Sequence, residues 1–191
     1  MKSSVRIEPL TADRWGDLER LFGKRGACGG CWCMWPRVPR AVFEAQKGDA
    51  NKRALKARVA SGPPPGLIAY VDGVPAAWCA LGPRDEFVRL LGSRTLKPVD
   101  AAPAWAIVCF FVARPFRRQG LSVVLLEHAA RFARRNGARL LEGYPVDPRA
   151  ARLPDAFAWT GIPASFERAG FVEVARRAPT RPIMRRALRR S

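Results

Sequence analysis

Histidine is almost absent from this sequence, which contains one histidine and five cysteines among 191 residues. A single histidine excludes a metal site built on several histidines, and any Ser-His or Cys-His catalytic pair would have to use His128. Because His128 lies in an apolar helical pattern, we expect it to be structural. Five cysteines are an odd number, and residues 1–10 lack the apolar run of a signal peptide, so we expect reduced thiols rather than a disulfide framework.

Long apolar runs and acidic residues are also scarce. The longest apolar run, residues 104–113, is far shorter than the roughly 20 residues of a membrane-spanning helix, so we expect a cytoplasmic protein with no membrane partner. Sixteen Asp and Glu stand against 34 Lys and Arg, a net charge of +18. Such a surface attracts anions, which makes phosphate-bearing ligands and nucleic acid candidate partners.

Two nucleotide-binding motifs are missing, the Walker A loop and Gly-x-Gly-x-x-Gly. Their absence removes the main sequence support for P-loop phosphoryl transfer and for a standard dinucleotide-binding fold. The composition, with 48% hydrophobic and 26% charged residues, is instead typical of a folded globular chain. At this length, we expect residues 1–191 to form one domain.

Hydrophobic periodicity predicts a mixed α/β fold. The expected helices cover residues 12–22, 40–60, 121–136 and 164–169, and the expected strands cover 5–10, 67–71, 74–81, 104–112, 138–146, 171–176 and 182–188. Asp72-Gly73 suits the tight turn of a hairpin. The nearly all-apolar strand 104–112 should lie in the middle of the sheet, and strand 138–146 should run parallel to it. The region 83–103 should be a loop with a short helical piece.

The segment Arg117-Arg118-Gln119-Gly120-Leu121-Ser122 joins that central strand to the next helix. Successive backbone N–H groups and the positive end of the helix dipole meet there, so the turn is a candidate anion cradle. Gly120 lets a ligand approach the backbone, and the two arginines add positive charge. Taken alone, the same spacing also fits an ordinary solvated basic turn.

This turn resembles the signature of the GNAT acetyltransferases, Arg/Gln-x-x-Gly-x-Gly/Ala between a strand and a helix. Arg117 and Gly120 match, and Ser122 replaces the usual Gly or Ala. The expected element order resembles the GNAT order over about the whole chain, including Phe166-Glu167-Arg168-Ala169-Gly170-Phe171. The resemblance implies a mostly antiparallel sheet with one splayed parallel strand pair, flanked by helices.

The resemblance also implies a cofactor and a reaction. Acetyl-CoA would be the co-substrate, with its pantetheine on the backbone of Phe110, Phe111 and Val112 and its pyrophosphate on residues 117–122, and no metal is expected. An amine would attack the thioester directly, while an N–H near Val112 binds the thioester carbonyl. A small-molecule amine is favoured over a protein as the acceptor.

The general acid does not follow from the resemblance. Many GNAT enzymes use a tyrosine where this sequence has Phe166, so the proton donor would be Tyr144, Ser165 or water, with Tyr144 preferred. Glu142 is the candidate base, acting through a water, and Asp147 is a candidate contact for a cationic acceptor. The alternative is that Tyr144 packs at a strand end and that Glu142 pairs with an arginine.

The segment from Cys28 to Trp35 is the most unusual. Its three cysteines lack a second Cys-x-x-Cys or a nearby histidine, which disfavours zinc. In the GNAT layout, Trp32, Met34 and Trp35 would line the acceptor pocket, although a local hydrophobic plug fits equally well. Two rival functions remain: a CoA-binding but non-catalytic domain with a basic nucleic-acid-binding surface, and a thiol or metal sensor built on Cys28, Cys31 and Cys33.

Overall fold

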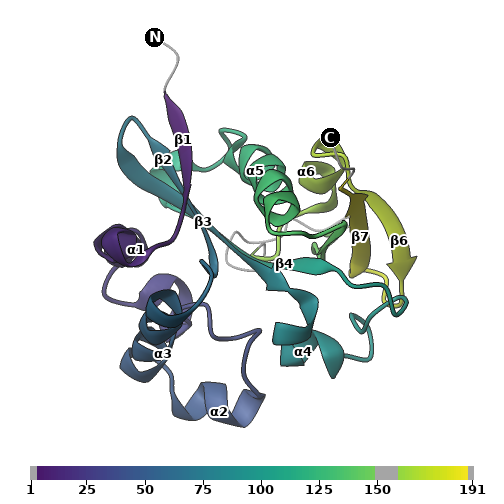
Figure 1. Cartoon of the computed structure of the whole chain (residues 1–191), viewed down its shortest axis with the longest axis horizontal. Helices are drawn as coiled ribbons and strands as arrows, with labels where there is room; N and C mark the ends of the chain where they lie inside the picture. Colours follow the sequence, from purple (N-terminus) through teal and green to yellow (C-terminus); the bar gives the residue numbers. More distant parts are fainter. Residues whose placement is uncertain (1–3, 149–158, 189–191) are drawn as a thin grey trace.

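A seven-stranded sheet organises the molecule (Figure 1). The computed structural model describes residues 4–148 and 159–188. The strands are β1 (Val5–Pro9), β2 (Gly66–Val71), β3 (Val74–Pro83), β4 (Trp105–Val112), β5 (Leu140–Gly143), β6 (Val172–Arg176) and β7 (Pro182–Ala187), in the spatial order β1-β2-β3-β4-β5-β7-β6. Among the described strands, β4 and β5 pair in parallel and all other neighbouring pairs are antiparallel. The predicted mixed fold is confirmed.

Helices cover both faces of the sheet (Figure 1). They are α1 (Trp15–Phe22), α2 (Arg40–Ala45), α3 (Asp49–Ser61), α4 (Val88–Leu91), α5 (Leu121–Arg135) and α6 (Pro163–Arg168). One core lies between the sheet and α5 with α6, and includes Leu125, Ala129 and Phe166. The other lies on the opposite face under α1 and α3, and includes Leu18, Leu55 and Trp78. Among the described residues, no helix has the length and apolarity that crossing a membrane requires.

The central strand is β4, as the sequence predicts, and it separates from its parallel neighbour partway along. Pairing joins residues 105–107 of β4 to residues 141–143 of β5, whereas β4 continues to Val112. A bulge lies at Val108, because Cys109 pairs with Ala80 while Ile107 pairs with Leu81. The predicted strand 138–146 is therefore too long, since its second half diverges from the sheet instead of extending the ladder.

The predicted helix 40–60 is wrong in one respect, because two helices, α2 and α3, occupy it. Gly48 interrupts the pattern with a φ of +87°, which favours glycine. Its N–H donates to the carbonyl of Gly30 at 3.0 Å. A Cβ on Gly30 would lie 2.7 Å from the Gly48 nitrogen, so the close approach of the two backbones places the break. The predicted hairpin is confirmed, with Asp72 and Gly73 both in the left-handed region.

Candidate functional site

The turn before α5 concentrates unpaired backbone donors. Arg118 has a φ of +61° and Gly120 a φ of +79°, and two left-handed residues so close together direct successive N–H groups toward one side. The first N–H groups of a helix also lack intrahelical acceptors. Within the described part of the chain, no acceptor is bonded to the amides of residues 119–122. The turn can therefore hold an anion with main-chain hydrogen bonds.

The side chains of this turn leave the space before Gly120 open. A Cβ on Gly120 would have no neighbour within 4 Å. Three side chains of the turn are anchored nearby: Arg117 Nε donates to the Val112 carbonyl at 3.0 Å, Gln119 Nε2 donates to the Pro115 carbonyl at 2.9 Å, and Ser122 Oγ lies 3.2 Å from Ser165 Oγ on α6. Arg118 is exposed, and Leu121 is buried in the core beneath α5.

A short segment bridges the opening between β4 and the chain after β5. The Phe110 N–H donates to the Trp159 carbonyl at 2.6 Å, and the Val146 N–H donates to the Gly161 carbonyl at 2.9 Å. We call residues 159–161 the bridging segment. It bonds to backbone that the family resemblance assigns to pantetheine, so a ligand lying along β4 at Phe110 requires the bridging segment to move.

The aromatic rings at the end of β4 face opposite sides of the sheet. The Phe110 ring packs edge-on against Phe166 at 6.0 Å between centroids, and Phe111 packs against Phe22 at 5.6 Å. Phe166 is fully buried, and its ring lies so close to Gly143 that a Cβ there would meet it at 2.0 Å. The residue that replaces the usual family tyrosine is thus a core residue.

Glu142 and Tyr144 meet in a buried polar network on the α1 and α3 side of the sheet. The Tyr144 hydroxyl donates to Glu142 Oε2 at 2.7 Å. Arg84 Nη1 lies 3.1 and 3.2 Å from the two carboxylate oxygens, and Arg185 Nη2 lies 2.6 Å from Oε1. Burial, followed by the charge of Glu142, raises the pKa of Tyr144 well above its ordinary value, so the phenol stays protonated at neutral pH.

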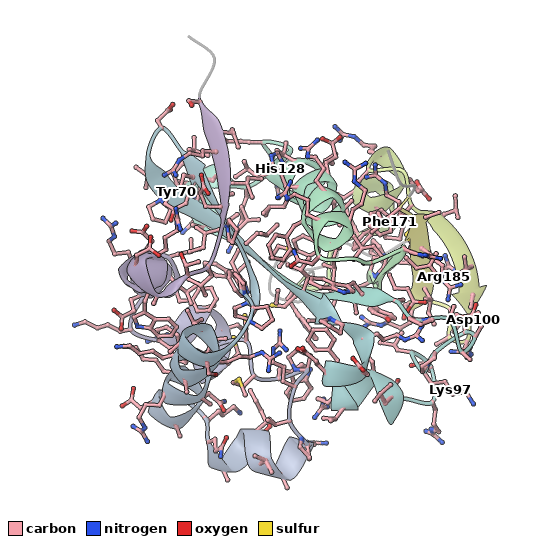
Figure 2. The ribbon with its side chains drawn as sticks, in the orientation of Figure 1. Tyr70, Lys97, Asp100, His128, Phe171 and Arg185 are labelled. Atoms are coloured by element: carbon pink, nitrogen blue, oxygen red, sulfur yellow. The ribbon has the colours of Figure 1, made fainter. Side chains whose placement is uncertain are left out.

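The network also includes the segment between β3 and β4, to which Arg84 belongs and which Arg185 contacts. Arg185 Nη1 lies 2.7 Å from Asp100 Oδ2, and Figure 2 shows these two side chains next to each other. Arg84 Nη2 donates to the Ala102 carbonyl at 2.8 Å. The network therefore fastens the 84–104 region to β5 and β7, and it fixes the orientation of Tyr144 where the two parallel strands begin to separate.

The other predicted contacts lie apart from this network. Asp147 is ion-paired with Arg176, with 2.7 Å between Oδ2 and Nη1. Trp32 and Met34 are buried, and Trp35 is half-buried with the Arg89 guanidinium carbon 3.6 Å above its ring. Trp32 lies at a cavity of about 420 Å³ whose other lining residues are Gly16, Glu19, Arg20, Gly23, Lys24, Asp49 and Lys52. An acceptor role for these residues stays a prediction.

Several participants were not predicted from the sequence. Arg84 and Arg185 are 58 and 43 residues from Glu142 along the chain, and no local pattern pairs them with it. No local sequence pattern predicts the bridging segment. His128, in contrast, lies on α5 as expected, with Nδ1 3.0 Å from the Val124 carbonyl oxygen.

Solved structures resemble this architecture at low sequence identity. A GNAT-family acetyltransferase from Listeria monocytogenes aligns with a TM-score of 0.58 and 11% identity, covering 98% of this chain and 99% of that one. A GNAT-family acetyltransferase from Streptococcus pneumoniae gives 0.54 and 12%, covering 97% and 99%. The PaiA N-acetyltransferase of Thermoplasma acidophilum, solved in complex with coenzyme A, gives 0.51 and 13%, covering 96% and 99%. These likenesses concern the fold.

Family membership is tested by comparison of sequences. The comparison with curated proteins finds no match. The family model "Acetyltransferase (GNAT) family" matches residues 32–154, which is more than half of the chain. The match includes β4, α5 and, between them, the turn of residues 117–122, which we call the donor-rich turn. The chain therefore belongs to the GNAT acetyltransferase family.

Proposed function

We propose that this protein transfers the acetyl group of acetyl-CoA to an amine of a small molecule. The observation that carries the proposal is the turn of residues 117–122, where two left-handed residues and the start of α5 leave backbone N–H groups open to an anion. Family membership supports acetyl transfer, and the Thermoplasma relative binds coenzyme A with a similar fold.

The pyrophosphate of acetyl-CoA would lie on residues 117–122, and the pantetheine would lie along β4. The Phe110 N–H faces the opening toward β5, and backbone N–H groups alternate in direction along a strand, so the Val112 N–H faces the same opening. In this placement a β4 amide hydrogen-bonds the thioester carbonyl and stabilises the negative charge that develops on its oxygen. The bridging segment vacates the space when the ligand binds.

Acetyl transfer then needs few protein groups. The amine nitrogen attacks the thioester carbon and gives up one proton to solvent, the carbon–sulfur bond breaks, and the leaving thiolate takes a proton. Tyr144 is the proposed proton donor, because it is a protonated phenol that directly follows the last β5 residue paired with β4. To protonate the thiolate, its O–H must release Glu142 Oε2, to which it donates in this structure. The oxygens of Glu142 accept hydrogen bonds from Arg84, Arg185 and Tyr144, which supports a positioning role; the predicted water-mediated base role stays a prediction.

The acceptor contacts are proposed from position alone. Asp147 offers a carboxylate to a cationic acceptor, but it would have to exchange its ion pair with Arg176. Trp32, Met34 and Trp35 would contribute apolar surface only after the loop that carries them opens, because two of them are buried. A small, cationic amine fits this arrangement best.

One observation favours a second candidate function, CoA binding without catalysis coupled to nucleic-acid binding. Arg131, Arg168 and Arg186 come from three different elements and line a cavity of about 420 Å³, and Glu127 is the acidic residue among its described lining residues. Such a cluster suits a phosphate group. The two functions differ in turnover, so an assay of CoA release with a panel of amines separates them. A salt titration of RNA binding should accompany this assay, because the second function also requires nucleic-acid binding.

The decisive test of the proposed function is CoA affinity by calorimetry for Gly120→Glu. A carboxylate at the open turn repels the diphosphate and fills its place, so we expect affinity to fall by at least about tenfold. The matched control is Gly137→Glu, which puts the same side chain on a left-handed glycine at the other end of α5, also in open space. Undiminished affinity in Gly120→Glu would place CoA elsewhere.

A further inference from the structure

The cysteine-rich loop, residues 26–35, adopts an unusual backbone beside the sheet. Three residues other than glycine have a positive φ: Ala27 at +66°, Trp32 at +33° and Cys33 at +53°. Residues that carry a Cβ hold such conformations only where their surroundings fix them. Cys33 is fixed by contacts of its buried side chain with β3 and β4.

The sulfur of Cys33 is in contact with a second sulfur, that of Cys109. The Trp78 indole N–H on β3 donates to Cys33 Sγ at 2.7 Å. Cys33 in turn can donate its S–H to Cys109 on β4, with 4.0 Å between the two Sγ atoms. A disulfide needs about 2.05 Å between its sulfurs, so these atoms have about 2 Å to close. The two thiols are 76 residues apart in the chain, and the fold brings them face to face.

Cys109 is the more accessible member of this pair. It follows the part of β4 that pairs with β5, which ends at Ile107, and its side chain is half-buried, whereas Cys33 is buried. Burial raises the pKa of the Cys33 thiol well above its ordinary value, so this thiol stays protonated at neutral pH. A small oxidant therefore reaches Cys109 before Cys33.

We propose that Cys33 and Cys109 form a reversible disulfide when the protein meets a peroxide, and that this bond fastens the cysteine-rich loop to β4. In the first step the Cys109 sulfur attacks one oxygen of hydrogen peroxide and the O–O bond breaks. The products are the Cys109 sulfenic acid and a hydroxide, which takes the Cys109 proton and becomes water. In the second step the Cys33 sulfur displaces the hydroxyl of the sulfenic acid, which leaves as water with the Cys33 proton. The two thiols lose two electrons in total, and the peroxide gains them.

Other uses of these sulfurs fit the geometry less well. Cys79 on β3 belongs to the core under α5, whereas Cys109 packs on the opposite face of the sheet. The Cys31 thiol donates to a carbonyl within its own loop at 3.2 Å. Among the residues that the structure describes, no group of three or more His, Cys, Asp or Glu side chains is arranged to hold a metal ion. The contact between Cys33 and Cys109 therefore suits oxidation better than metal binding.

The disulfide would hold in place the loop that carries Trp32, Met34 and Trp35. These side chains are the proposed acceptor contacts, and two of them are buried, so they become available only when the loop opens. Oxidation should therefore slow acetyl transfer by hindering the acceptor. This consequence rests on the proposed function, whereas formation of the disulfide does not.

The test treats the full-length protein with one equivalent of hydrogen peroxide and follows its intact mass and the disulfides in its digest. We expect the wild type to lose two hydrogen atoms of mass, reversibly with dithiothreitol, and to give a peptide pair that links Cys33 to Cys109. In Cys109→Ser the yield of this product should fall by at least about tenfold. The control Cys31→Ser, in the same loop as Cys33, should form the link like the wild type.

A thermal unfolding measurement supplies a check that needs no variant. A disulfide between residues 76 apart constrains the unfolded chain, so the oxidised wild type should melt at least about 5 °C above the reduced protein. Three results would overturn the proposal: a disulfide that links Cys31 to Cys33, an undiminished yield of the oxidised product in Cys109→Ser, or further oxidation of Cys109 without a link to Cys33. None of these readouts depends on CoA binding.

The effect on acetyl transfer is measured separately, with an amine that the reduced protein acetylates. We expect kcat/KM for this amine to be at least about tenfold lower after oxidation and to recover with dithiothreitol. Equal activity of the two forms would show that the link does not regulate transfer. A lack of turnover in both forms would instead contradict the proposed function, and the mapped disulfide would still decide whether Cys33 and Cys109 pair.

Discussion

The two tyrosine side chains of this molecule make similar hydrogen bonds at different places in the fold. The sequence contains only Tyr70 and Tyr144, and each hydroxyl donates to a carboxylate at 2.7 Å, Asp17 for Tyr70 and Glu142 for Tyr144. Tyr70 lies on β2 (Figure 2), and its hydroxyl reaches Asp17 on α1. Tyr144 lies where β4 and β5 separate. Position, not hydrogen-bond chemistry, therefore makes Tyr144 the candidate acid.

Replacing each tyrosine by phenylalanine separates catalysis from stability. Each variant loses one hydrogen bond, which is buried at Tyr144 and partly buried at Tyr70, so each should lower the free energy of unfolding by about 1 kcal/mol. Only Tyr144→Phe should lower kcat, by about a hundredfold, with the Kd for CoA unchanged. Steady-state kinetics and urea unfolding measure both effects. If Tyr144→Phe and Tyr70→Phe have equal kcat, the proton comes from another donor.

At the residue scale, the sequence predicts a feature only where residues close together in the chain produce that feature. The donor-rich turn was predictable because a left-handed glycine before a helix is a local feature. The partners of Glu142 were not, because they come from β7 and from the segment after β3. The contact between Cys33 and Trp78 is likewise 45 residues apart in the chain, so the cysteine motif alone did not reveal it.

At the scale of elements, the sequence predicts the order and type of nearly every helix and strand, and errs where tertiary contacts decide. The break between α2 and α3 follows from the contact of Gly48 with Gly30, which no periodicity encodes. β5 ends where the chain diverges from β4, and this divergence is a tertiary feature. The bridging segment adds a third case, because it fills the opening that the family resemblance assigns to a ligand.

Loosening the bridging segment should strengthen CoA binding. Gly161 has a φ of +83°, and a Cβ there would lie 2.8 Å from the Phe166 ring, so Gly161→Ala displaces the segment. The Phe110 N–H then no longer has to leave the Trp159 carbonyl when the ligand binds. One net hydrogen bond is worth about 1 kcal/mol, so the Kd for CoA should fall about fivefold by calorimetry.

The control for this variant is Gly170→Ala. That glycine also has a positive φ, 78°, but its nearest atom to an added Cβ is 3.7 Å away, so the substitution introduces strain without moving the bridging segment. It should leave the Kd for CoA unchanged. Weaker CoA binding in Gly161→Ala would mean that the segment forms part of the ligand site instead of competing with the ligand.

At the scale of the whole molecule, positive charge is the dominant feature. With 34 Lys and Arg and 16 Asp and Glu, self-repulsion opposes the compact state. Hydrogen bonds and ion pairs that stabilise the carboxylates offset part of this repulsion. The Tyr70 hydroxyl lowers the pKa of Asp17, and Lys52 lowers the pKa of Glu19. A lowered carboxyl pKa stabilises the fold above the ordinary value near pH 4, and this contribution is lost as the pH falls through the lowered value.

Salt should therefore stabilise this protein, and more strongly in acid. Raising the salt concentration from about 0.01 to about 0.1 M shortens the screening length from about 30 to about 10 Å, which weakens long-range repulsion. At pH 7 the urea midpoint should rise with sodium chloride. At pH 3 most carboxylates are protonated and the net charge approaches the number of cationic residues, so the rise should be steeper. If salt instead lowered the urea midpoint at both pH values, attractive ion pairs would outweigh the repulsion between cationic residues. The excess of arginine would then be explained by binding of a polyanion.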